Sequence, residues 1–128
     1  MTTPTPNPGQ PAPSAPLLDL SPLHEVTGGA TDILHEILRE YVTTSRDLLR
    51  DIRAALAASD AKALRQAAHS LKGSSATIGA QRLRAECEII EHAALAGRIA
   101  DAQAHHLQLE QTFSATMSLL DRAVQDQA

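Results

Sequence analysis

The feature that most constrains the fold of this chain is a long proline-free region with helical periodicity. No proline occurs after Pro22, so no proline interrupts a helix in the remainder of the chain. In this region apolar side chains recur at spacings of three, four and seven residues, as on a helix with one buried face. The longest such stretch carries Ile33, Leu34, Ile37, Leu38, Tyr41, Leu48, Leu49, Ile52 and Leu56. It predicts a long amphipathic helix that ends near Ser59.

Three further helices are expected from the same pattern. The first runs from Ala61 to about Ile78, and its inner face carries Leu64, Ala68, Leu71, Ser75 and Ile78. The next ends at Gly97 and carries Leu83, Cys87, Ile90 and Ala94. The last carries Leu109, Phe113, Met117, Leu120 and Val124. Long amphipathic helices joined by short connections are antiparallel neighbours. The chain is therefore predicted to be all-α, with an antiparallel four-helix bundle.

A short extra helix is expected before the bundle. Ser21 is a candidate N-cap and Pro22 suits the first helical position, so a helix can start there and run through about Val26. Gly28 and Gly29 then stop it.

Three other residues are expected to cap the longer helices. Thr31 and Asp60 are candidate N-caps for the long helix and for the helix that follows it. Gly79 is a candidate C-terminal stop for that second helix.

The N-terminal segment has a different composition. Residues 1–16 hold six of the seven prolines, and such a segment favours extended conformations and buries little apolar surface. We expect residues 1–16 to be a disordered tail or linker and residues 17–125 to form the bundle domain. Recognition of the segment by a proline-binding module is the alternative.

Composition narrows the possible functions. The chain has one Tyr, one Phe and no Trp, and its formal net charge is −4. It therefore lacks both the stacking side chains and the basic surface that nucleic-acid binding uses. One cysteine, Cys87, excludes an intrachain disulfide and suggests a reducing compartment. We find no apolar run of membrane-spanning length and no signal peptide, so we expect a cytoplasmic protein without direct membrane contact.

One outward helix face concentrates reactive and charged residues. On a helical wheel His69 points away from the inner face, and Lys62, Arg65 and Lys72 project on the same outer side. Gly73 lies there too, one turn after His69. A glycine inside a helix costs about 1 kcal/mol relative to alanine. It also leaves bare backbone beside the ring, which allows another large molecule to approach closely.

These residues suit transfer of an anionic group onto the imidazole. Neutral imidazole is a nucleophile, and Lys72 could neutralise an anion carried on the ring. Phosphoryl is the obvious anion, because its transfer needs mainly positioning and charge neutralisation. The alternative reading is also open at this point: an exposed histidine is most often simply solvated, and the three cations could be a solubilising face.

A resemblance to a known family favours the first reading. The run His69–Ser75, which reads His-Ser-Leu-Lys-Gly-Ser-Ser, is followed by Ile78-Gly79-Ala80 and Leu83. It resembles the signature of histidine-containing phosphotransfer (HPt) domains, and the similarity extends from about Leu17 to Val124. Such domains carry a phosphoryl group between receiver-domain aspartates of a multistep two-component phosphorelay.

The resemblance implies roles for five residues. His69 matches the phospho-accepting histidine, and Lys72 matches the lysine that holds the phosphoryl oxygens. Gly73 matches the glycine that leaves room for the receiver, and Ser74 matches a small supporting residue. Glu91 matches a position in the next helix from which Glu or Gln often accepts a hydrogen bond from the inner ring nitrogen. A carboxylate there would fix the tautomer and leave the outer nitrogen free to attack.

The resemblance also implies how the domain works with others. Its partners would be response-regulator receiver domains and a hybrid sensor histidine kinase, and it would be a monomer. It would be a phosphocarrier without ATP-binding or autokinase activity and without a cofactor or metal of its own, because the receiver supplies Mg²⁺. The alternative is a non-catalytic helical protein-binding module in which His69 is incidental.

Overall fold

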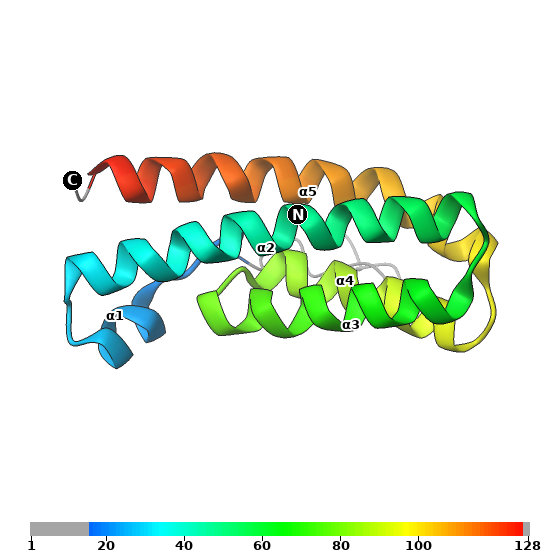
Figure 1. Ribbon diagram of the computed structural model, residues 1–128, viewed down its shortest axis with the longest axis horizontal. Helices are drawn as coiled ribbons and strands as arrows, with labels where there is room; N and C mark the ends of the chain where they lie inside the picture. The colour runs from blue at the N-terminus through cyan, green and yellow to red at the C-terminus, as the bar shows by residue number, and fades with distance from the viewer. Residues whose placement is uncertain (1–15, 127–128) are drawn as a thin grey trace, which may run out of the picture.

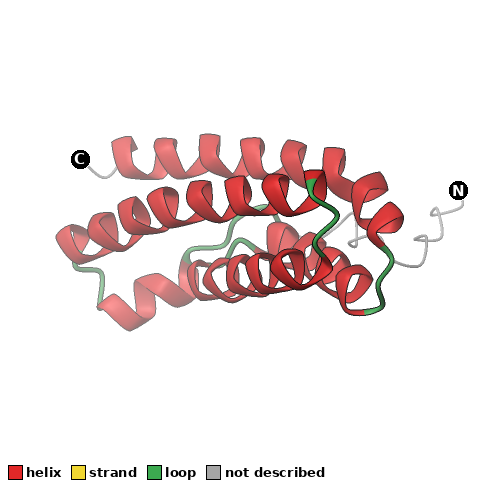
Figure 2. Cartoon of the chain, turned by 45° about the vertical axis from the view of Figure 1, so that its right-hand side comes forward, coloured by secondary structure: helices red, strands yellow, loops and turns green. Residues whose placement is uncertain are grey.

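A computed structural model describes residues 16–126 of the protein, and this range forms five helices. Figure 1 shows their arrangement. They are α1 (Ser21–Thr27), α2 (Thr31–Ala57), α3 (Ala61–Ile78), α4 (Gln81–Leu95) and α5 (Ile99–Asp126). This range contains no strand, as Figure 2 also shows. The all-α prediction is therefore confirmed. Except for Pro16, the tail expected over residues 1–16 lies outside the described residues.

The four long helices form an antiparallel bundle. Each runs opposite to the one before it (Figure 1). Helix α3 packs between α2 and α4, while α5 packs against α4 and α2. The short α1 contacts α2 and α3. The bundle with one extra N-terminal helix is thus as predicted, and α3 is an outer helix of the bundle with one face open to solvent.

The predicted apolar stripes meet in one core. All five inner-face residues of α3, and the stripe residues predicted for α4, are buried. On α5 the stripe is buried from Leu109 to Leu120, and Val124 packs partly buried against it. The stripe predicted for α2 is wrong at Ile33, which is 51% exposed because Leu34 and Leu38 take the inward positions.

Both predicted ends of α3 are confirmed. The carboxylate of Asp60 accepts a hydrogen bond from the backbone N–H of Ala63 at 3.0 Å, which satisfies one of the donors left free at a helix start. Gly79 follows the last turn with φ +89°, the left-handed conformation that glycine adopts most readily.

The predicted caps of α1 and α2 are wrong by one residue. Ser21 and Thr31 are each the first helical residue, and the capping positions belong to Leu20 and Ala30, whose side chains cannot cap. The Asp19 carboxylate instead accepts from the N–H of Ser21 at 3.0 Å.

Two of the long helices also end slightly earlier than predicted. Helix α2 ends at Ala57 instead of near Ser59, and α4 ends at Leu95, before Gly97.

Two contacts fix the position of α3 against its surroundings. The buried hydroxyls of Tyr41 and Ser75 are 2.7 Å apart and join α2 to α3. At the end of α3, the N–H of Asp19 donates to the carbonyl oxygen of Gly79 at 2.9 Å. This hydrogen bond ties the segment before α1 to the turn between α3 and α4.

Candidate functional site

Helix α3 presents His69 to solvent. Its side chain is 67% exposed, whereas Ala68 and Leu71 of the same helix are fully buried. The difference follows from helical geometry, because Ala68 and Leu71 belong to the inner stripe and His69 lies outside it. An imidazole in this position is accessible to another protein.

Glu91 of α4 binds both His69 and Lys72. One carboxylate oxygen, Oε2, lies 2.5 Å from Nδ1 of His69, and the other, Oε1, lies 2.5 Å from Nζ of Lys72. The side chain of Glu91 is only 11% exposed. A buried carboxylate therefore joins the imidazole and the ammonium group from the neighbouring helix.

The charge of Glu91 determines which nitrogen of His69 is free. Burial raises the pKa of Glu91, but the hydrogen bonds from Lys72 and His69 outweigh burial and hold that pKa below its usual value. An ionised carboxylate only accepts hydrogen bonds, so Nδ1 carries the ring proton. In the neutral ring the other nitrogen, Nε2, then holds the lone pair. This is the nucleophilic form of the side chain.

Lys72 is less accessible than the sequence suggests. Its side chain is 25% exposed and its ammonium group is paired with Glu91, although the sequence places it beside the ring as a cation for an incoming anion. The sequence could not show this pairing, because it depends on how α4 packs against α3. Lys62 and Arg65 of the same helix are exposed.

The surface beside Gly73 is open. A Cβ placed on Gly73 would meet no atom of the described residues within 4 Å. Packing among residues 16–126 therefore does not require glycine at position 73. A requirement for glycine would have to come from a molecule that approaches α3 from outside.

Ser74 is engaged with its own helix. Its hydroxyl donates to the backbone carbonyl oxygens of Ser70 and Leu71, at 3.1 and 3.3 Å. Serine hydroxyls in helices commonly bond to the preceding turn in this way. The supporting role that the resemblance implies for Ser74 would thus act through the backbone of α3.

Cys87 and His106 make their contacts within the bundle, away from His69. Cys87 is fully buried in the core, and burial raises the pKa of its thiol well above the usual value, so the thiol stays protonated. His106 bonds to Glu110, which also forms a bidentate pair with Arg53. Within residues 16–126 no three His, Cys, Asp or Glu side chains are placed to hold a metal ion.

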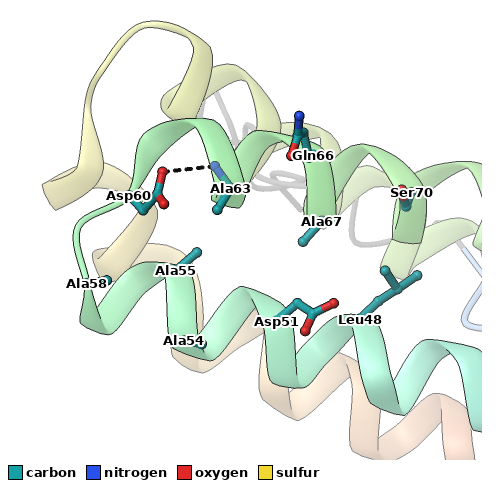
Figure 3. Close-up of a pocket in the computed structure, with 10 residues that line it drawn as sticks. All are labelled: Leu48, Asp51, Ala54, Ala55, Ala58, Asp60, Ala63, Gln66, Ala67 and Ser70. Atoms are coloured by element: carbon teal, nitrogen blue, oxygen red, sulfur yellow. Dashed lines mark hydrogen bonds between the residues drawn. The ribbon is translucent and has the colours of Figure 1, made fainter.

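Two grooves lie along the seam between α2 and α3, and their linings reach Ser70 and Ser74, the residues next to His69 and Gly73 in the sequence. The larger, of about 520 Å³, extends from the α2–α3 turn to Ser70 and has an alanine-rich floor (Figure 3). The smaller, of about 270 Å³, includes Ile37, Tyr41 and Ser74. The sequence did not predict the α2 residues that line the two grooves. The helical periodicity of α2 shows which of its residues face inward, but it does not show which residue of α3 each of them contacts.

Comparison with known proteins identifies the family. A sequence model of the Hpt domain matches residues 36–124, which is more than half of the chain. The chain belongs to the Hpt domain family. Hpt domains are phosphocarriers in histidine-dependent phosphorelays, where they interact with receiver domains and histidine kinases.

A solved Hpt structure resembles this chain over most of its length. It is the crystal structure of histidine-containing phosphotransfer protein B (HptB) from Pseudomonas aeruginosa PAO1. The two chains are 38% identical, the match covers 88% of this chain and 98% of HptB, and the TM-score is 0.80. No curated protein matches this chain. Among the described residues, no helix combines the length and apolar character needed to cross a membrane.

Proposed function

We propose that Nε2 of His69 accepts a phosphoryl group from the aspartyl phosphate of a receiver domain and passes it to a second receiver. The observation that carries this proposal is the exposed imidazole whose inner nitrogen is bound by the buried carboxylate of Glu91. That bond fixes both the tautomer and the orientation of the ring. Lys72 would hold the phosphoryl oxygens, and Ser74 would support the site from the backbone of α3.

The reaction needs no other catalytic group from this chain. The lone pair of Nε2 attacks phosphorus, the bond between phosphorus and the aspartate oxygen breaks, and the carboxylate of the receiver leaves with the electron pair. Such a transfer depends mainly on in-line placement and charge neutralisation. We propose that the receiver brings Mg²⁺ and that this domain supplies no cofactor, ATP site or autokinase activity.

The receiver would dock along the seam between α2 and α3. Its close approach is possible where Gly73 leaves the helix backbone bare, and the linings of the two grooves reach Ser70 and Ser74 of the same helix. Helix α1 and the residue before it carry three apolar side chains that could also contact a receiver, namely Leu20, Leu23 and Val26. Leu23 is buried and Leu20 is partly buried, whereas Val26 is 83% exposed. Of the three, Val26 is therefore the residue placed to contact a receiver.

We place this function in a cytoplasmic relay. The donors and acceptors would be response-regulator receivers, one of them attached to a hybrid sensor histidine kinase. Residues 17–125 would act as one monomeric phosphocarrier domain.

The test is transfer from a phosphorylated receiver to wild type, His69→Gln and His92→Gln. His92 is the matched control, because it lies on α4 and its side chain is 68% exposed, against 67% for His69. We expect acid-labile phosphate on wild type and His92→Gln and none on His69→Gln. A panel of receivers from the source organism would name the partners. Equal labelling of all three proteins would contradict the proposal, and no labelling with retained receiver binding would favour a non-catalytic binding module.

A further inference from the structure

Glu91 is negatively charged, although a neutral hydrogen-bond acceptor at this position would be enough to orient the ring of His69. A glutamine oxygen can accept the Nδ1–H hydrogen bond as a carboxylate does. A mostly buried carboxylate has a desolvation cost, which here is offset by the hydrogen bonds from Lys72 and His69. Holding the ring in place therefore does not account for the charge of Glu91.

The charge matters once the ring is phosphorylated. When the lone pair of Nε2 has formed the bond to phosphorus, a ring that still holds the Nδ1 proton is cationic. A nearby anion favours a cationic group, and Oε2 of Glu91 lies 2.5 Å from Nδ1. Loss of the Nδ1 proton would make the ring neutral. The ring would then have to leave as an imidazolate anion in the next transfer.

We infer that Glu91 keeps Nδ1 of His69 protonated while the ring carries phosphoryl, so that the ring leaves as neutral imidazole when the group moves on. The inference rests on the proposed function and adds a second role to the orienting residue. In the onward step the bond between Nε2 and phosphorus breaks, its electron pair returns to Nε2, and the receiver aspartate forms the new bond to phosphorus. The Nδ1 proton stays in place in both directions, so neither step needs proton exchange with solvent.

Lys72 modulates this effect. Its ammonium group binds Oε1 of the same carboxylate at 2.5 Å, so it withdraws part of the negative charge that faces the ring. Removing the ammonium charge should strengthen the hold of Glu91 on the Nδ1 proton, whereas removing the carboxylate charge should weaken it. The two substitutions should therefore act in opposite directions, which a merely structural role of either residue would not produce.

The other ionisable groups near Glu91 do not replace its pairing with His69 and Lys72. The Cys87 thiol is buried and protonated, and Glu86 is directed towards His105 of α5. Lys62 and Arg65 share the outer face of α3, and Glu40 and Asp51 line the seam from α2.

The experiment measures protonation of Nδ1 directly. Protein with ¹⁵N-labelled histidine is phosphorylated on His69, either by phosphoramidate or by a phosphorylated receiver, and the Nδ1 chemical shift is followed from pH 5 to pH 9. His69→Gln identifies the signal. Compared with wild type, we expect the midpoint of Nδ1 protonation to fall by about one pH unit in Glu91→Gln. We expect it to rise in Lys72→Met.

Glu88→Gln is the matched control. Glu88 lies one turn earlier on α4, where its half-exposed side chain faces Arg84 and His92, and its substitution should leave the midpoint unchanged. Equal midpoints in wild type and Glu91→Gln would overturn the inference and leave the relay assignment intact. If phosphoramidate phosphorylates wild-type His69 but no phosphorylated receiver does, the proposed function is wrong. The midpoints of Nδ1 protonation would still decide the role of Glu91. If neither donor labels His69, both fail.

Discussion

His69 and Gly73 lie one helical turn apart on the outer face of α3. We therefore expect a bulky side chain at position 73 to affect transfer from a receiver and transfer from a small phosphoryl donor differently. Replacing Gly73 with leucine adds a side chain where the protein has open space. The fold should gain about 0.5–1 kcal/mol from higher helix propensity. Transfer from a receiver should fall at least about tenfold, because correct placement of the two reacting groups is lost. Urea unfolding and phosphotransfer kinetics measure the two effects.

The control for Gly73→Leu separates bulk from position. Ala104→Leu adds a leucine on the exposed side of α5, away from the α2–α3 seam, and should leave transfer unchanged. Phosphoramidate is small enough to reach the ring past the added leucine side chain, so its reaction with His69 should continue in Gly73→Leu. If receiver transfer survives in that variant, Gly73 does not serve close approach.

At the level of elements, the turn after α3 depends on a glycine for two separate reasons. Gly79 has φ +89°, and a Cβ there would collide with the carbonyl oxygen of Asp19. Gly97 has φ +72° in the turn after α4, but a Cβ there would meet no atom of the part of the chain that the structure describes within 4 Å. Gly97→Ala should therefore cost about 1–2 kcal/mol of unfolding free energy for the left-handed conformation alone. Gly79→Ala should cost clearly more in the same urea titration. Equal losses would mean that the contact with Asp19 contributes nothing.

The helices show which parts of this molecule could be predicted from the sequence. Period and capping chemistry place α3 correctly, because Asp60 and Gly79 act through their own neighbours. The start of α2 is misplaced at Thr31, because Ala30 takes the capping position without any side-chain signal. The Glu91–Lys72 pair could not be predicted either, since it depends on the packing of α4 against α3.

At the scale of the whole molecule, a buried acid couples stability to pH. Glu86 of α4 is fully buried, and its Oε1 lies 3.6 Å from Nε2 of His105 on α5. Burial raises the pKa of Glu86 to about 7, although Thr112 and Arg82 offset part of that effect. The folded protein therefore holds this proton up to about pH 7, whereas the unfolded chain releases it near the ordinary value of 4.5. Stability must then fall as the pH rises through that window.

Glu86→Gln removes this pH dependence. Its unfolding free energy at pH 8 should exceed that of wild type by about 1–3 kcal/mol, and the gain should shrink towards pH 5, where Glu86 is protonated when folded. Burial lowers the pKa of His105, so its effect on stability has the opposite sign: the unfolding free energy decreases as the pH falls below about 6.5.

Urea titrations from pH 5 to pH 8 measure how the unfolding free energy changes with pH for both residues. Glu88→Gln on the same helix, with a half-exposed side chain, should give the wild-type slope. If Glu86→Gln also shows the wild-type dependence of unfolding free energy on pH, ionisation of Glu86 costs the folded protein little free energy. The contact between α4 and α5 then contributes no pH dependence through this residue.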